Sequence, residues 1–179
     1  EMQQSCKRIR RGTHYANGDG VGRYYKLTDP EADKVHGYYY EKQTSAGWSF
    51  GASRPNSYNF MDGFTVPSIY DWNNLFNKLG GKEVAGGKLK QTGTNNWRSP
   101  NTGATNSSGF NAVPSGTISA LGNIAGFGFE STYWSYDPEG TRIQGRYYNE
   151  VRFEYDSREA FIRDDSQNYV GYYPIRLMR

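Results

Sequence analysis

The sequence is poor in the residues that usually build the core of a globular protein. Only 35% of its 179 residues are hydrophobic, and Leu and Ala are scarce. Aromatic residues nevertheless make up 16% of the chain, whereas disordered chains contain few of them. We therefore expect a folded protein whose core depends on aromatic rings, because each ring buries a large area. The 22 glycines favour many turns and little helix.

Cysteine and long apolar runs are also scarce. Cys6 is the single cysteine, so the chain has no internal disulfide. No apolar run is long enough to cross a membrane and no signal peptide is recognisable, so we expect no direct membrane insertion. The length suits one domain, which we place at residues 24–179. Residues 1–23 would form a polar N-terminal arm or a link to a preceding segment.

A strong excess of either charge is absent, since the net charge is +3. The basic run at residues 7–11 is typical of a solvated arm. Nucleic-acid binding would require a broader basic face, so we expect no nucleic-acid partner.

Recognisable catalytic and metal-binding motifs are lacking too. With one Cys and two His residues, the sequence has no cluster with metal-ligand spacing, and it has neither a nucleophile elbow nor a phosphate-binding loop. Turns and solvated faces account for the acidic residues that could otherwise form a general acid and base pair, which are Asp156, Glu159, Asp164 and Asp165. We therefore expect a protein that is not an enzyme and that needs no cofactor or metal.

The clearest secondary-structure signal is a helix within residues 66–81. Ser68 can cap its start, and Asp71 three residues later fits a capping box. Gly80 and Gly81 predict its end, because glycine accepts the left-handed conformation. The apolar residues that recur at helical spacing and would share one face are Trp72, Leu75, Phe76 and Leu79.

Elsewhere in residues 1–130, the sequence predicts short helices and strands joined by long loops. Residues 82–90 predict a second short helix that contains two glycines. Strands are expected at 24–28 and 37–43, with a turn or short helix at 31–35 between them. Loops rich in Gly, Ser, Asn and Pro are expected at residues 13–22, 45–63 and 91–130.

The end of the chain predicts strands at residues 131–135, 149–155, 159–163 and 172–178. In the second of these strands, Val151, Phe153 and Tyr155 alternate with charged residues, which predicts that one face points to the core. Pro174 has no N–H, which predicts that the last strand lies at a sheet edge or contains a bulge.

Five segments resemble, in the right order, the motifs of a known family. They read GFTVPSIYDWNNLFNKLGG at 63–81, AGGKLKQTGTNNW at 85–97, NSSGFNAVPSG at 106–116, YWS at 133–135 and YPIRLMR at 173–179. The chain is similar in these segments to the Fibrobacter succinogenes major paralogous domain family, a group of bacterial surface-associated modules. The similarity covers about residues 64–179, and the first 60 residues depart further from the family pattern.

This resemblance implies an α+β protein with a C-type-lectin-like fold, which has one or two helices, a small twisted, mostly antiparallel sheet and long irregular loops. It implies a binding or structural module on a cell surface, in the extracellular space or on a phage virion. Proteins with this fold also serve as the variable proteins of diversity-generating retroelements. Their mutable residues lie in a C-terminal strand–loop–strand region, which corresponds to residues 136–172 of this sequence.

The C-terminal region also has the composition of a binding surface. Eight of the 16 tyrosines lie at residues 133–173 and fall on both parities of the strands, so some must face water. Exposed Tyr beside Arg, Asn and Ser is typical of a binding surface, because Tyr supplies contact area at low entropic cost. Alternation would place Arg152 and Glu154 on the outward face of one strand, and Phe161 and Arg163 on that of the next. The candidate ligand-binding residues are Tyr136, Arg146, Tyr148, Asn149, Arg152, Glu154, Asp156, Arg158, Phe161, Arg163, Asp164, Asp165, Gln167, Asn168, Tyr169 and Tyr172.

Three functions remain open at this point. The first is a ligand- or receptor-recognition domain on a bacterial surface or phage tail fibre, which binds a protein or glycan on another cell. The second is a structural cell-surface or appendage subunit whose C-terminal face packs against a neighbouring chain. The third is a degradative enzyme or its carbohydrate-binding accessory module. Homo-oligomers are compatible with the first two.

Overall fold

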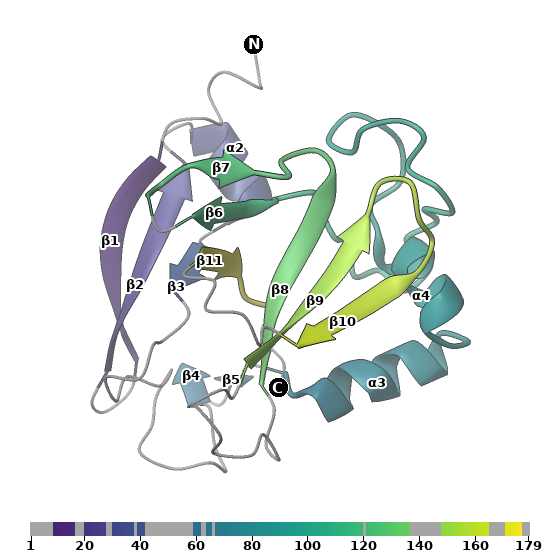
Figure 1. The fold of residues 1–179 in the computed structure, drawn as a ribbon, viewed down its shortest axis with the longest axis horizontal. Coiled ribbons are helices and arrows are strands. Elements are labelled where there is room, and N and C mark those ends of the chain that lie inside the picture. Colours follow the sequence, from purple (N-terminus) through teal and green to yellow (C-terminus); the bar gives the residue numbers. More distant parts are fainter. Residues whose placement is uncertain are drawn as a thin grey trace.

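The computed structural model describes residues 9–16, 20–27, 30–37, 39–41, 59–61, 64–65, 67–119, 121–136, 148–164 and 171–176. In these residues a few short helices pack with small antiparallel sheets, so the protein belongs to the α+β class, as predicted (Figure 1).

The larger sheet contains six antiparallel strands in the order β1-β2-β3-β11-β6-β7 (Figure 1). These strands are β1 (Ile9–Ala16), β2 (Gly20–Leu27), β3 (Tyr39–Glu41), β11 (Gly171–Pro174), β6 (Thr117–Ser119) and β7 (Ile124–Ala125). Helix α2 (Pro30–His36) connects β2 to β3, in the place where a turn or a short helix was expected.

The prediction of a loop at 13–22 is wrong at 13–16 and 20–22, which are strand, and 17–19 lie outside the described residues. β1 and β2 pair over their whole length, and Arg10 and Arg11 of the basic run belong to β1 rather than to a free arm. β2 also pairs with β3 through Tyr24 and Tyr25, which connects the β1–β2 pair with the rest of the six-stranded sheet. The segment shows no apolar alternation, because its strand structure depends on pairing partners that a local pattern does not reveal.

The second sheet contains the three antiparallel strands β8 (Glu130–Tyr136), β9 (Tyr148–Glu154) and β10 (Ala160–Asp164), in the order β10-β9-β8. All three were predicted. A further pair, β4 (Asn59–Met61) and β5 (Phe64–Thr65), begins inside the loop predicted at 45–63. β6 and β7 are two short strands within the region predicted to be irregular at 91–130.

Helix α3 (Ile69–Lys78) confirms the helix prediction and both of its ends. The Asp71 N–H donates to the Ser68 hydroxyl at 3.2 Å, and the Ser68 N–H donates to the Asp71 carboxylate at 2.8 Å. This capping box satisfies N–H groups that a helix start leaves without partners. At the other end, Gly80 and Gly81 have φ angles of 95° and 98°, which favour glycine.

Helix α4 (Lys82–Leu89) confirms the second helix, and its two glycines have a packing reason. A Cβ atom on Gly86 would overlap the carbonyl oxygen of Glu159, and one on Gly87 would overlap that of Gly103. The Gly87 N–H instead donates to the carbonyl oxygen of Arg158 at 2.8 Å. The absence of side chains therefore lets α4 lie directly against the turn between β9 and β10.

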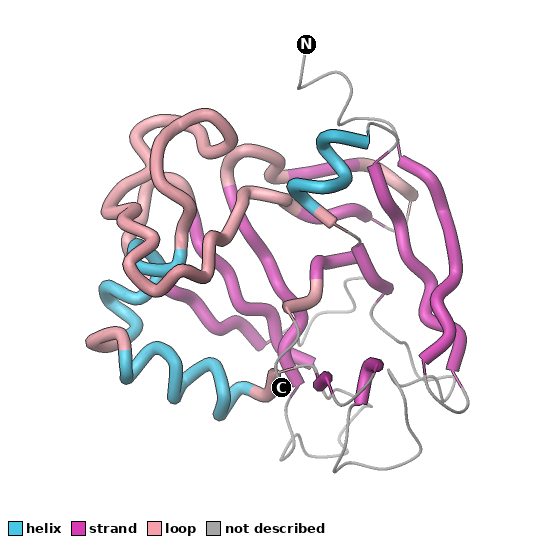
Figure 2. Tube along the Cα trace, turned by 180° about the vertical axis from the view of Figure 1, so that it is seen from behind, coloured by secondary structure: helices cyan, strands magenta, loops and turns pink. Residues whose placement is uncertain are grey.

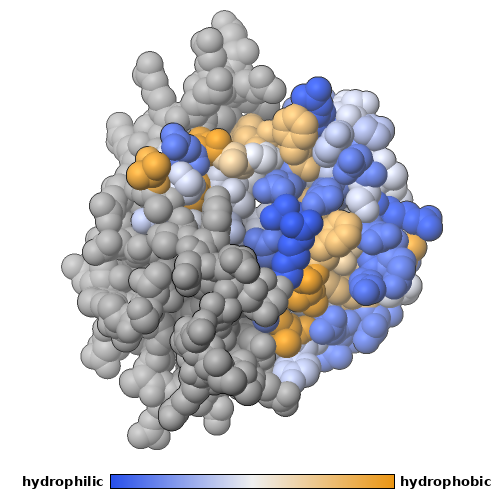
Figure 3. Space-filling model, in the orientation of Figure 1, coloured by the Kyte–Doolittle hydropathy of each residue, from blue (hydrophilic) through white to orange (hydrophobic). Residues whose placement is uncertain are grey.

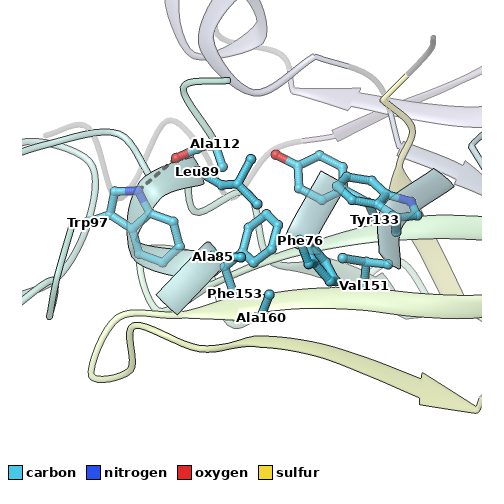
Figure 4. Close-up of a cluster of buried hydrophobic side chains, with 10 residues drawn as sticks. Phe76, Ala85, Leu89, Trp97, Ala112, Tyr133, Val151, Phe153 and Ala160 are labelled. Carbon is cyan, nitrogen blue, oxygen red and sulfur yellow. Dashed lines mark hydrogen bonds between the residues drawn. The ribbon is translucent and has the colours of Figure 1, made fainter. Parts of the chain in front are cut away.

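The main core lies between the helices and one face of the three-stranded sheet (Figure 4). Its buried residues are Trp72, Phe76, Ala85, Leu89, Trp97, Ala112, Tyr133, Val151, Phe153 and Ala160. The Trp72 ring lies 6.0 Å from that of Tyr133 and 6.3 Å from that of Phe153, measured between centroids. The Trp97 Nε1–H donates to the Ala112 carbonyl at 2.9 Å (Figure 4). The core is thus largely aromatic, as the composition predicts.

Lys90 fastens the irregular segment after α4 to the strands. It is 0% exposed, and its Nζ donates to the carbonyl oxygens of Thr102, Glu154 and Ser157 at 3.0, 2.8 and 2.7 Å. All three donors of the ammonium group are therefore used. Burial lowers the pKa of Lys90 to about 8, against the charge of Asp156, which raises it.

The two larger sheets meet at Trp134 of β8. Its side chain is 0% exposed, its Nε1–H donates to the Tyr40 carbonyl at 2.9 Å, and its ring centroid lies 4.2 Å from that of Tyr173. These contacts connect β8 with β3 and β11 of the other sheet.

The prediction from Pro174 is wrong, because β11 is not an edge strand. β11 lies between β3 and β6, and Pro174 is its last residue, opposite Tyr39. β6 pairs only with Gly171 and Tyr172, so no partner on that side requires an N–H at Pro174. The strand ends at Pro174, and residues 177–178 of the predicted strand lie outside the described residues.

Candidate functional site

The three-stranded sheet has a second face, opposite the core. Arg152 of β9 lies between Thr132 of β8 and Phe161 of β10, and such cross-strand partners point to the same side of a sheet. Hydrophilic and hydrophobic side chains adjoin each other over these strands (Figure 3). We define the outward face as the side chains of Glu130, Glu150, Arg152, Glu154, Phe161 and Arg163.

Arg152 is the centre of an ion-pair network on the outward face. Its Nη1 lies 3.0 Å from the Glu130 carboxylate and 3.7 Å from that of Glu154. Its Nη2 lies 2.8 Å from the Glu150 carboxylate. Arg163 approaches Glu154 at 3.4 Å and Glu150 at 4.0 Å. Three carboxylates thus surround two guanidinium groups, which leaves one negative charge in excess.

Burial and neighbouring charges act in opposite directions on the pKa of Glu130 and on that of Arg152. Burial raises the pKa of Glu130, and the charge of Arg152 opposes this change. Burial by itself lowers the pKa of Arg152, but the charges of Glu150 and Glu130 outweigh it, so the pKa is raised. Arg152 therefore stays a cation at any physiological pH.

Accessibility increases across the outward side from β8 to β10. Thr132 is 0% exposed, the Arg152 side chain is 19% exposed and the Arg163 side chain is 49% exposed. Thr132 Oγ1 and Arg152 Nε are buried without a hydrogen-bond partner, although most buried polar atoms have one. A ligand would therefore approach over β9 and β10, where Arg163 is more accessible than Arg152.

Four of the residues predicted from the sequence come together on this face, namely Arg152, Glu154, Phe161 and Arg163. The alternation is also confirmed on the other side, because Val151 and Phe153 are both 0% exposed. The part of these four residues in ligand binding stays a prediction.

Asp156 and Arg158 lie elsewhere. Both are exposed in the turn between β9 and β10, whereas Asn149 and Asp164 pair at the other end of these strands. Six positions along the chain separate Arg158 from Asp164, or roughly 20 Å in an extended strand. The structure therefore does not place these two turn residues with the far end of the predicted site.

The other predicted residues are buried or lie outside the described part of the chain. Asn149 is 8% and Tyr172 is 4% exposed, so their side chains lie beneath the surface. The backbones of Tyr136, Tyr148 and Asp164 end β8, begin β9 and end β10, and their side chains are not among those described. The predicted residues that lie outside the described residues are Arg146, Asp165, Gln167, Asn168 and Tyr169.

The sequence-based site omits two members of the network, Glu130 and Glu150. Glu150 could have been included, because it precedes Arg152 by two residues and shares its face. Glu130 could not, because its position beside Arg152 depends on the register of β8 against β9.

The outward face offers charged hydrogen-bonding groups beside one aromatic ring, since the Arg163 guanidinium lies 6.0 Å from the Phe161 ring centroid.

In the part of the chain that the structure describes, no group of three or more His, Cys, Asp or Glu residues is arranged to hold a metal ion. None of the described helices is long and apolar enough to cross a membrane.

Comparison with known proteins places the chain in a family. No curated protein and no solved structure matches it significantly. The family model for the Fibrobacter succinogenes major domain matches residues 5–179, which include the β1–β2 hairpin as well as the segments that showed the resemblance. The chain therefore belongs to the Fibrobacter succinogenes major domain family.

Proposed function

We propose that this chain is a non-catalytic recognition domain with a C-type-lectin-like fold, displayed on a bacterial surface or a phage tail fibre. It binds a protein or glycan on another cell through the outward face of β9 and β10 and through residues 137–147 and 165–170. The observation that carries the proposal is the contrast between the buried Val151 and Phe153 of β9 and the charged, partly exposed Arg152 and Glu154 on its other side.

Packing on the core side holds strands β9 and β10 in place. Val151, Phe153 and Ala160 are at most 2% exposed, and they pack against α3 and α4. A surface on packed strands holds its side chains in place, so less entropy is lost when a ligand binds. Outward residues can change while the buried ones keep the fold.

The outward side chains suit recognition. Arg and aromatic residues are enriched at the centres of protein interfaces, and Arg163 and Phe161 lie side by side here. Arg163 is about half exposed and meets its carboxylate partners only at 3.4 and 4.0 Å, so it can turn to a ligand at little cost.

Three strand ends lie together at one end of the three-stranded sheet. Tyr136 pairs with Tyr148, and Asn149 pairs with Asp164, so β8 and β10 end where β9 begins. Residues 137–147 and 165–170 start from these ends. Together with the outward face they correspond to the strand–loop–strand region that retroelements diversify in variable proteins of this fold.

Sequencing the gene across a population of its source organism or phage tests this proposal. We expect substitutions at residues 152, 154, 161 and 163 and at 136–148 and 164–169. The neighbouring core positions 151, 153 and 160 are the matched control, because they lie one residue away in the same strands and should not change.

Uniform sequences, or substitutions spread equally over both faces, would contradict diversification. A fixed recognition or structural module would then be the better explanation. Sedimentation of the purified chain separates these two, because a structural subunit would form stable oligomers that Phe161→Glu disrupts, whereas a recognition domain would keep its oligomeric state.

A further inference from the structure

A second candidate site lies on the opposite side of the three-stranded sheet, which Figure 2 views from behind. A pocket of about 610 Å³ opens there between the end of α2, residues 109–115 and the residues that follow β11. Tyr133 lines this pocket from the core side of β8, whereas Thr132 points to the outward side. The pocket is therefore separate from the outward face, and its volume is typical of sites for small ligands.

Arg176 is held at this pocket by two contacts with Phe110. Its Nη2 donates to the Phe110 carbonyl at 2.9 Å, and its guanidinium carbon lies 4.5 Å from the centroid of the Phe110 ring. Phe110 in turn packs against the main core. The guanidinium group is thus oriented in advance, and an arginine has further N–H groups that can bind a carboxylate.

His36 adds a neutral hydrogen-bonding group to the pocket. Its Nδ1 lies 3.2 Å from the Ser115 hydroxyl, and its ring centroid lies 4.6 Å from that of Phe127. Burial lowers the pKa of His36 to about 4, so the imidazole is uncharged at neutral pH.

The charges around the pocket favour an anion. Among the described residues that line it, Lys34 and Arg176 are cationic and none is acidic. Lys34 pairs with Glu31 at 2.7 Å on the solvent side of α2, which partly neutralises it. Arg176 makes no ion pair with a described residue, so it is the cation that a ligand carboxylate would meet.

The remaining polar lining suits hydroxyl groups. Three carboxamides line the pocket, and the Asn96 amide donates to that of Gln91 at 2.8 Å, while Asn111 is exposed. Amides both donate and accept, as the hydroxyl groups of a sugar do. We propose that this pocket binds a uronic acid unit of an acidic saccharide, with the carboxylate on Arg176 and the hydroxyl groups on the amides.

Titration of the whole chain with glucuronate and with glucose, followed by calorimetry and two-dimensional NMR, tests the proposal. The two probes differ only in the carboxylate, so we expect millimolar affinity for glucuronate and at least about 10-fold weaker binding of glucose. Shifted resonances should come from Phe110, His36 and the residues after β11, and not from β9 and β10. Binding at β9 and β10 alone would overturn this proposal without touching the proposed function.

Two arginine variants make the test specific. Arg176→Gln should weaken glucuronate binding at least about 10-fold and leave glucose binding nearly unchanged. Arg98→Gln is the matched control, because Arg98 also lies over a ring, 4.7 Å from the centroid of Phe129, but does not line the pocket. Arg176→Lys keeps the charge and serves if the glutamine variant folds poorly.

Two outcomes would overturn the proposal. One is the absence of saturable binding of glucuronate or digalacturonate up to about 50 mM. The other is equal weakening by Arg176→Gln and Arg98→Gln, which would show that the effect is one of general charge.

Discussion

The two faces of strand β9 differ in how their side chains are satisfied. On the core side, Val151 and Phe153 are fully buried among aromatic rings. On the outward side, Arg152 and Glu154 belong to a network of charges that becomes more exposed towards β10. The contrast teaches that β9 is anchored mainly on its core side, whereas Arg152 and Glu154 on its other side stay partly exposed.

We expect the largest loss of stability from the removal of the buried Lys90 ammonium group. Lys90→Met removes the ammonium group and leaves three carbonyl oxygens without their donor. Each buried unsatisfied group costs about 1–3 kcal/mol, so we expect a loss of roughly 5 kcal/mol in the free energy of unfolding. Urea denaturation measures it. Lys82→Met, at an exposed lysine of α4, is the control, and an equal loss there would contradict the role of Lys90.

The second prediction compares the loss of one phenylalanine ring on each side of the three-stranded sheet. Phe153→Ala opens a cavity in the core and should cost about 4 kcal/mol of unfolding free energy. Phe161→Ala removes a ring from the outward face, where it is only partly buried, and should cost less than about 1 kcal/mol. Thermal and urea unfolding of both variants measure these losses. Similar losses would contradict the difference between the core side and the outward face.

A pH effect of about 3 kcal/mol on stability should also arise at His36, at the end of α2. Its pKa is lowered from 6.5 to about 4 in the folded protein, so the unfolded chain binds the proton more readily. Stability is therefore complete above pH 6.5, falls as the pH drops towards 4 and then levels off. Lys34 and Arg176, which line the same pocket, would oppose the protonation further.

His36→Gln isolates this effect, because Gln keeps a hydrogen-bonding group near Ser115 but does not titrate. Urea unfolding of both proteins between pH 4 and pH 7 gives the comparison. A constant difference between them over this range would show that His36 is not the titrating group.

The smallest effect lies on the outward face. A double-mutant cycle with Arg152→Gln and Glu150→Gln should give a coupling of about 1 kcal/mol, because this 2.8 Å pair is largely buried. A second cycle for Arg163 and Glu154, which are 3.4 Å apart and more exposed, should give less than about 0.5 kcal/mol. A larger coupling for the second pair would contradict the exposure gradient.

The sequence correctly predicted those elements that are determined by residues only a few positions apart. Ser68, Asp71 and the glycine pair marked both ends of α3, because caps depend on residues only a few positions apart. The alternation in β9 separated core from surface without knowledge of its neighbours. Alternation in β9 and β10 together predicted four of the six residues that define the outward face.

Local sequence patterns gave wrong predictions where a partner that is distant in the sequence determines the structure. Residues 13–16 and 20–22 belong to paired strands, and Pro174 is tolerated in a central strand because β6 ends short of it. A lysine between Leu89 and Gln91 looks solvent-exposed until three carbonyl groups from other segments surround it. The pocket beside Arg176 is likewise assembled from five segments that are separated in the chain.

The sequence by itself determined both central helices, the C-terminal strands and the residues that alternate on β9, while the α+β class was implied by the family resemblance. These features depend on capping, periodicity and glycine, which act over a few residues. Only the tertiary structure decided which strands are central, how the carboxylates gather around Arg152, and where buried polar groups find partners. These features depend on register and on burial, and both are set by contacts between residues that are distant in sequence.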